Sequence, residues 1–219
     1  MRKCILITNL RRALPLLFCL LTSITSHAEH VPYRIFGVLD GLPSVEINCI
    51  FRGSNGLLWF CTEEGLSYFE GQRFKNYSAE QGLPDCAVLD ILETNAGQYW
   101  VATMRGLAHF DPSARSSDGR NLLFENYQPN EGSPSLQIAK LAFGKDGKIW
   151  CSTHAGLYSF QPSTKRFEKV LPVIGGDWWT AMLSESDGSL WLGSQLLFIS
   201  GPTGLWTALA SAKGLPLSY

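Results

Sequence analysis

The stretch that decides the fold is residues 55–66, which read NGLLWFCTEEGL. It combines a tight Asn-Gly turn, a short apolar strand that contains a tryptophan, and a polar turn that glycine closes. The pattern returns at residues 96–107 (AGQYWVATMRGL), at residues 146–157 (DGKIWCSTHAGL) and, in a shorter form, at residues 187–194 (DGSLWLGS). The chain is therefore an array of repeats.

Two independent markers define the length of the repeat. The tryptophans stand at positions 59, 100, 150 and 191, and a Gly-x-Pro motif begins at positions 41, 82, 132 and 214. Both markers advance by the same amount from the first copy to the second, and both advance further from the second to the third. The extra length is the polar segment 111–121 of the second copy. A period of about 40 residues with four short strands per unit predicts an all-β fold built from β-propeller blades.

The strands of the first unit are predicted at residues 45–51, 57–62, 66–69 and 74–77. Copies of the third strand are expected at residues 107–110 and 157–160, and copies of the fourth at residues 124–127 and around Phe167. The predicted blades cover residues 41–81, 82–131, 132–172 and 173–213, and residues 214–219 begin a further blade. A short strand at residues 33–36 is expected to be the fourth strand of another blade. Because every copy has one tryptophan in mid-strand, we expect these rings to pack between neighbouring sheets.

Residues 1–28 are predicted to be a secretory signal peptide. Basic residues precede an apolar run at positions 13–24, which is too short to span a bilayer comfortably. Ser26-His27-Ala28 has the small-x-small pattern of a cleavage site, so Glu29 is the expected mature N-terminus. The sequence thus predicts an exported, periplasmic or extracytoplasmic protein.

Composition excludes several kinds of partner. The formal net charge is −1, so no basic face is available to bind a nucleic acid. Four cysteines follow the signal peptide, at positions 49, 61, 86 and 151, without the spacing of a metal site. The sequence therefore predicts no metal and no cofactor. Cys61 and Cys151 are interpreted as small buried apolar residues, while a disulfide between Cys49 and Cys61 across one hairpin is the alternative.

The turns between the second and third strands carry the candidate site. Alternation of antiparallel strands places these turns at one end of the ring, and their side chains differ from copy to copy, as a binding face on a repeated frame would. The alternative is that turn residues vary because nothing constrains them. Trp178 and Trp179 form an unrepeated aromatic pair that could stack on a sugar ring, with core packing as the rival. The candidate ligand-binding residues are Glu63, Glu64, Met104, Arg105, His154, Trp178, Trp179 and Gln195.

No catalytic residue is predicted. Glu63 and Glu64 are adjacent rather than a spaced acid pair, and His154 has no visible partner that would make it a base.

The repeat resembles a known family. The pattern is Gly41-Leu42-Pro43, then Gly56-x-x-Trp59, Thr62-x-x-Gly65-Leu66, and Phe74-x-x-Tyr77; it resembles the two-component regulator propeller repeat. The resemblance covers about residues 33–216, although the fourth copy lacks the Thr-x-x-Gly-Leu element. It implies the extracytoplasmic sensor part of membrane histidine kinases, hybrid two-component proteins or diguanylate cyclases, with ligands that are often oligosaccharides. It carries over no catalytic residue.

The resemblance also shapes the expected partners. Family members continue into more blades, a transmembrane helix and an output domain, so the chain is expected to be an N-terminal piece of a longer sensor or a truncated reading frame. Alone, it is expected to be poorly stable, to form homo-oligomers or to close imperfectly. Two further functions remain open at this point: a propeller lyase or hydrolase, and a scaffold that binds a partner protein.

Overall fold

A computed structural model describes residues 33–111, 122–129, 137–171, 180–194, 197–201 and 204–208. The chain divides into two compact units, Met1–Ile35 and Phe36–Tyr219, and the second carries all the described strands. The predicted signal peptide lies outside the described residues, as do most of the segment 111–121 and the predicted further blade from residue 214. None of the helices in the described ranges is long and apolar enough to cross a membrane.

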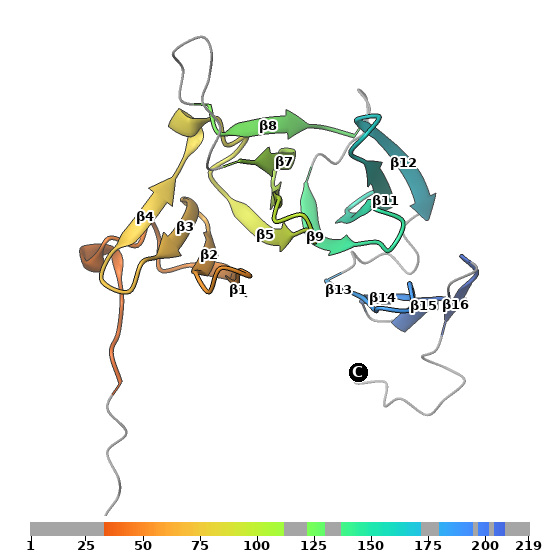
Figure 1. The fold of residues 1–219 in the computed structure, drawn as a ribbon, viewed down its shortest axis with the longest axis horizontal. Helices are drawn as coiled ribbons and strands as arrows, with labels where there is room; N and C mark the ends of the chain where they lie inside the picture. The colour runs from red at the N-terminus through yellow and green to blue at the C-terminus, as the bar shows by residue number, and fades with distance from the viewer. Residues whose placement is uncertain are drawn as a thin grey trace, which may run out of the picture. The chain divides into compact units, whose positions relative to one another are not determined.

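The described residues form sixteen strands in four antiparallel sheets of four, so the all-β prediction is confirmed. In each sheet the hydrogen-bonded neighbours follow chain order, which Figure 1 shows as four successive groups of arrows. We call these sheets blades 1 to 4. Blade 1 contains β1 (Ile47–Arg52), β2 (Leu58–Thr62), β3 (Gly65–Phe69) and β4 (Phe74–Tyr77). Blade 2 contains β5 (Val88–Glu93), β6 (Tyr99–Thr103), β7 (Gly106–Phe110) and β8 (Phe124–Tyr127).

The other two blades repeat this order. Blade 3 contains β9 (Ile138–Phe143), β10 (Ile149–Thr153), β11 (Gly156–Gln161) and β12 (Arg166–Leu171). Blade 4 contains β13 (Ala181–Ser184), β14 (Leu190–Gly193), β15 (Leu197–Ser200) and β16 (Trp206–Ala208). The predicted fourth strands at residues 74–77 and 124–127 agree with β4 and β8. The predicted limits of the blades along the chain stay predictions.

The strand predicted at residues 33–36 is wrong, because this backbone is not paired in a ladder. Its last side chain nevertheless packs as expected for that position. The Phe36 ring lies 5.1 Å from Phe69 and 5.7 Å from Phe74, between ring centroids. Tyr77, the last residue of β4 in blade 1, makes the corresponding contacts with blade 2, at 4.8 Å with Phe110 and 6.2 Å with Phe124. Phe36 therefore has the packing of a fourth-strand residue without the strand.

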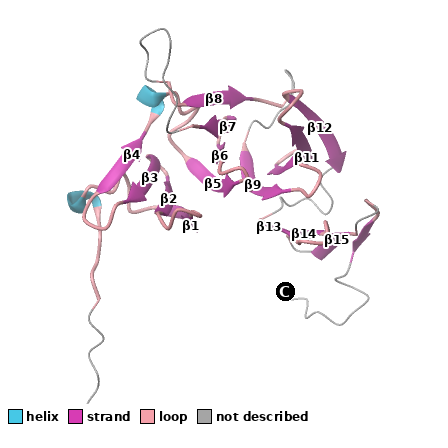
Figure 2. Cartoon of the chain, viewed as in Figure 1, coloured by secondary structure: helices cyan, strands magenta, loops and turns pink. Residues whose placement is uncertain are grey.

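Two short 3₁₀ helices, η1 (Val38–Asp40) and η2 (Ala79–Gln81), lead into the Gly-Leu-Pro motifs and are the cyan segments of Figure 2. Each helix ends at a glycine with positive φ, +100° at Gly41 and +95° at Gly82, a conformation that other residues rarely adopt. The Gly82 carbonyl accepts a hydrogen bond of 3.0 Å from Asn126 Nδ2, and Gly41 accepts one of 2.9 Å from Asn76. The segment that leaves one blade is thus fastened to the outer strand of the next.

Trp59 and Trp100 pack between blades, as predicted. Trp59 is 2% exposed, and its ring centroid lies 5.1 Å from Tyr99 and 5.7 Å from Phe110, both in blade 2. Trp100 of blade 2 lies 5.4 Å from Phe160 of blade 3. A ring that fills the space between two sheets removes a large apolar area from water on both sides. These tryptophans therefore have a structural role.

A half-buried carboxylate links the inner strands of blades 2 and 3. Asp90 accepts a hydrogen bond of 2.9 Å from the backbone N–H of Leu141 and lies 3.8 Å from Lys140 Nζ. Burial raises the pKa of Asp90, and the nearby Lys140 charge and the Leu141 N–H offset only part of that effect.

The cysteines behave in two ways. Cys49 and Cys61 face each other in the β1–β2 ladder and form a disulfide, so the interpretation of Cys61 as a free apolar residue is wrong. The ladder explains the pairing: a register shift between Ile47 and Cys49 brings Cys49 opposite Cys61. Cys151 is a buried free thiol, as interpreted, and Cys86 is free and exposed.

Candidate functional site

The turn that joins the second and third strands is built in the same way in blades 1 to 3. In blade 1 the Thr62 hydroxyl donates to the Gly65 carbonyl at 2.9 Å and accepts from the Glu64 backbone N–H at 3.1 Å. Thr103 and Thr153 repeat both bonds in blades 2 and 3. The threonine thus holds the backbone of the turn while the two residues after it can vary.

The glycine of this turn is required by its surroundings. Gly65 has a φ of +137°, and a Cβ at this position would lie 2.5 Å from the carbonyl oxygen of Tyr77. Gly106 has the same relation to Tyr127. The Thr-x-x-Gly and Phe-x-x-Tyr parts of the repeat are therefore two sides of one close contact between β3 and β4, or between β7 and β8.

Glu63 is held between two blades. Asn48 Nδ2 lies 2.9 Å from Glu63 Oε1 and 2.9 Å from the backbone carbonyl of Val88, which belongs to the inner strand of blade 2. Glu63 is half-buried, whereas its neighbour Glu64 is exposed. Of the two adjacent carboxylates, Glu63 is therefore the one whose direction is set by an amide that also contacts the next blade.

The corresponding side chains of blades 2 and 3 are exposed. Met104 and Arg105 both face solvent, and the Arg105 backbone carbonyl accepts a hydrogen bond of 3.2 Å from Gln128 Nε2. His154 Nε2 lies 2.6 Å from Oε1 of Gln137, the residue that precedes β9. The turns thus present an acid, a cation and an imidazole at one end of successive blades.

Not every predicted residue can be placed. Trp178, Trp179 and Gln195 lie outside the described residues, so the aromatic-pair hypothesis stays a prediction. Glu63, Glu64, Met104, Arg105 and His154 all lie in turns at the same end of their strands. Within the described ranges, no group of three His, Cys, Asp or Glu side chains could hold a metal ion.

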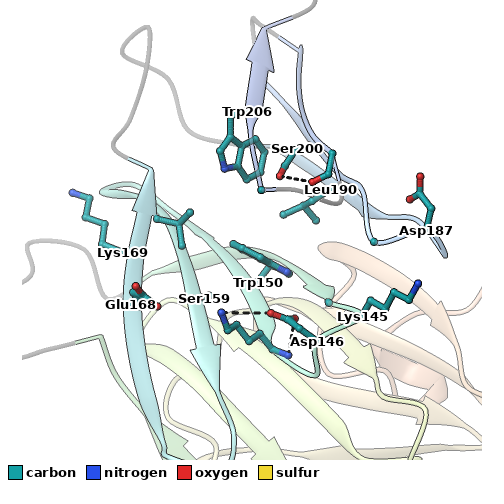
Figure 3. Close-up of a pocket in the computed structure, with 16 residues that line it drawn as sticks. Lys145, Asp146, Trp150, Ser159, Glu168, Lys169, Asp187, Leu190, Ser200 and Trp206 are labelled. Carbon is teal, nitrogen blue, oxygen red and sulfur yellow. Dashed lines mark hydrogen bonds and ion pairs between the residues drawn. The ribbon is translucent and has the colours of Figure 1, made fainter.

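A pocket that the sequence did not predict lies between blades 3 and 4 (Figure 3). Its volume is about 760 Å³. It borders the hairpin turns near residues 144–148 and 187–188, which are at the opposite end of the strands from Glu63 and its counterparts. Its lining includes Trp150, Ser159, Glu168, Leu190, Ser200 and Trp206.

Comparison of the blades explains why this pocket exists. Trp150 is paired across the ladder with Ser159, whereas Trp59 is paired with Tyr68 and Trp100 with His109. The Tyr68 ring lies 4.9 Å from Trp59, and His109 lies 4.7 Å from Trp100. In blade 3 a serine replaces this ring, so one face of Trp150 is uncovered.

The facing wall has lost a ring as well. Ser200 pairs with Leu190 and Trp206, in the register that Phe110 has with Tyr99 and Phe124. Two ring-to-serine replacements, at positions 159 and 200, therefore open the pocket. The missing phenylalanine near residue 200 is visible in the sequence as part of the degenerate fourth copy, but its effect requires the register between blades.

Known proteins share both the repeat and the fold. The sequence model described as two component regulator propeller matches residues 41–64. The extracellular domain of BT4673 from B. thetaiotaomicron, described as a one component system in one structure and as a hybrid two component system in another, is 20% identical with a TM-score of 0.65 in the first. That match covers 87% of this chain and 24% of the solved extracellular domain, so the chain spans about a quarter of that domain.

Other solved structures have different activities on the same fold. Virginiamycin B lyase from Staphylococcus aureus is 17% identical with a TM-score of 0.62, covering 80% of this chain and 59% of the lyase. PorZ, a surface component of the type-IX secretion system of Porphyromonas gingivalis, is 18% identical with a TM-score of 0.56, covering 84% and 29%. At these identities the likeness shows the propeller fold alone. The comparison with curated proteins finds no match.

Proposed function

From a chain that carries the two-component regulator propeller repeat and folds into propeller blades, we propose a ligand-sensing module of a signal-transduction protein. The module binds a small molecule or an oligosaccharide on the extracytoplasmic side of a membrane. It passes the change to a membrane-linked output domain that is outside this chain. The extracellular domains among the similar structures and the signal-like residues 1–28 support this location.

One observation carries the proposal. Blades 1 to 3 keep the same turn frame, with Thr62, Thr103 and Thr153 bonded identically, while the side chains that follow differ in charge and shape. A rigid frame that presents different polar groups at one end is typical of a binding face rather than of packing. Glu63, Glu64, Met104, Arg105 and His154 are the proposed contacts, and Trp178, Trp179 and Gln195 are proposed from the sequence alone.

The proposed role is binding rather than catalysis. The two glutamates of blade 1 are adjacent in one turn, and hydrolysis of a glycosidic bond needs two separated carboxylates. These side chains suit recognition of hydroxyl groups by hydrogen bonds.

Calorimetric titration of the full chain with a panel of neutral and acidic oligosaccharides tests the proposal. For any sugar that binds, Glu63→Gln, Arg105→Ala and His154→Ala are expected to weaken the affinity, by roughly tenfold where a charged hydrogen bond is lost. Gln98→Ala is the matched control, because Gln98 is an exposed polar residue of a turn at the other end of blade 2.

Two results would contradict the proposal. One is the absence of binding to the whole panel by a folded chain. The other is binding that the three turn variants leave unchanged, which would move the ligand away from this end of the blades.

A further inference from the structure

We propose that the pocket between blades 3 and 4 is a second binding site, which takes a small planar aromatic molecule that carries an ammonium group. This site goes beyond the proposed function, because it lies at the other end of the strands and does not depend on a signalling role. Its lining comes from Trp150, Ser159 and Glu168 of blade 3 and from Leu190, Ser200 and Trp206 of blade 4.

The shape of the ligand follows from the ring that is missing. In blade 2, Phe110 lies stacked at 4.7 Å on Phe124 and edge-on at 5.7 Å to Trp59. Phe160 similarly lies 4.7 Å from Phe167 and 5.4 Å from Trp100. At the next interface the residue in this position is Ser200. A planar ring in this space would contact Trp206 on one side and Trp150 on the other, as the phenylalanines contact their neighbours.

The two indoles favour an aromatic ring over a saturated one. Aromatic pairs at contact distance attract each other beyond the area that they bury, because the edge of one ring is positive and the face of the other is negative. Trp150 and Trp206 are both half-buried and flank the same pocket in Figure 3. Their faces also attract a cation placed nearby.

The charged side chains around the pocket indicate which polar group the ligand ring should carry. Lys148 Nζ is 3.4 Å from Asp146 Oδ2, so these two charges neutralise each other. Lys169 lies over the Tyr158 ring at 5.9 Å and points away from the pocket in Figure 3. Glu168, paired in register with Ser159, forms no ion pair with any described side chain. This carboxylate is placed to accept hydrogen bonds from an ammonium group.

Lys145 lies at the rim of the pocket and does not cancel the Glu168 charge. Its side chain faces Gly188 of blade 4. The positive charge of Lys145 is also one of the smaller causes of the lowered pKa of Asp187. The larger cause of that lowered pKa is the pair of hydrogen bonds from the Ser189 N–H and hydroxyl. Lys145 is therefore directed toward blade 4 and lies away from Glu168 in Figure 3.

Tyramine titrated into the full chain, followed by tryptophan fluorescence and protein-detected NMR, tests the site. Saturable binding is expected, with a dissociation constant on the order of 1 mM, because a ligand of this size has few atoms that can make contacts. Ser200→Phe restores the residue of blades 2 and 3 and should abolish binding. Ser159→His, which restores the residue of blade 2, should do the same and serves if Ser200→Phe does not fold.

Three probes separate the parts of the proposal. Glu168→Gln should weaken the binding of tyramine by roughly tenfold. It should leave the binding of p-cresol, which has the ring but no ammonium group, unchanged. Cyclohexylmethylamine, a saturated ring with an ammonium group, should bind more weakly than tyramine. Ser163→Phe, an equal change at an exposed turn of blade 3, should leave tyramine binding unchanged.

The proposal is overturned if tyramine shows no saturable binding to the folded chain. It is also overturned if Ser200→Phe and Ser159→His, both folded by circular dichroism, bind as the parent does. Equal affinity for cyclohexylmethylamine, or binding of a neutral disaccharide in place of tyramine, would refute the aromatic assignment. The outcomes expected for tyramine do not depend on whether an oligosaccharide binds at the turns between the second and third strands.

Discussion

Thr103 is fully buried at the end of β6, and its hydroxyl makes two hydrogen bonds to the backbone of the exposed turn that follows. Thr103→Val keeps the shape of the side chain but leaves a carbonyl and an N–H without their partner. We expect the free energy of unfolding to fall by about 1–3 kcal/mol. Urea denaturation measures the change, and Thr207→Val, at an exposed strand position, should be nearly neutral. Equal effects of the two substitutions would refute the role of this hydroxyl.

Asp90 gives the chain a pH dependence whose sign is fixed by its surroundings. Burial raises its pKa above the ordinary value of 3.8, so between that value and the raised pKa the folded state binds more protons than the unfolded state. The contribution of Asp90 to stability is therefore complete below the ordinary pKa and decreases as the pH rises through the raised pKa.

Asp90→Asn should remove this decrease, because an amide does not titrate and can still accept the hydrogen bond from Leu141. Urea denaturation from about pH 4 to pH 7 should show a flatter stability curve for the variant than for the parent. Glu80→Gln, at an exposed position, is the control that should keep the parent slope. A parallel pair of curves for the parent and Asp90→Asn would contradict the raised pKa.

At the scale of the element, the glycines of the hairpins are of two kinds. Gly65 has a positive φ and a neighbouring carbonyl in the position of a Cβ, whereas Gly56 has a positive φ of +82° and nothing within 4 Å. Gly56→Ala should destabilise by roughly 1–2 kcal/mol, which is the cost of the backbone conformation alone. Gly65→Ala should cost clearly more, about 3 kcal/mol or more, since β3 and β4 must also move apart. Equal losses in thermal unfolding would show that the contact with Tyr77 is not limiting.

The repeat allowed most of the elements to be predicted, for a physical reason. Residues that each blade needs, such as Trp59 and Gly65, recur at fixed spacing, and the period alone identifies them as construction. The strand at residues 33–36 was mispredicted because a sequence pattern shows the preference for a strand but not the partner strand. The disulfide was left open because its pairing depends on a bulge in β1 that no pattern in the sequence indicates.

The candidate site was predictable only in part. Turn positions such as Glu63 follow from strand alternation, which needs no coordinates. The pocket near Trp150 and Ser200 was missed because it is formed by residues that are absent from their usual places in two adjacent blades. Its detection requires the register of one sheet against the next.

At the scale of the whole molecule, blade 1 exposes an apolar face. The equivalent face of blade 2 is covered by blade 1. Ile50 is 65% exposed and Leu58 is 39% exposed, whereas their counterparts in blade 2, Ile91 and Tyr99, are each 5% exposed beneath blade 1. A second copy of the chain is expected to cover this face, because exposed apolar patches on sheets promote association.

Light scattering after gel filtration should show association that increases with protein concentration. Ile50→Glu should shift the chain toward the monomer without unfolding it, since Ile50 is mostly exposed. Ile91→Glu is the contrasting variant and should unfold the chain, because it buries a charge without a partner. An unchanged mass distribution for Ile50→Glu would exclude this face as the contact.

The placement of the tryptophans also sets an order of events during synthesis. Trp59 of blade 1 contacts Tyr68 of its own blade, but Tyr99 and Phe110, which complete its burial, belong to blade 2. A newly made blade therefore leaves part of its indole exposed to water until the following repeat has been translated. Each repeat is completed by its successor, so during synthesis we expect the full burial of a tryptophan to follow its own blade by about one repeat.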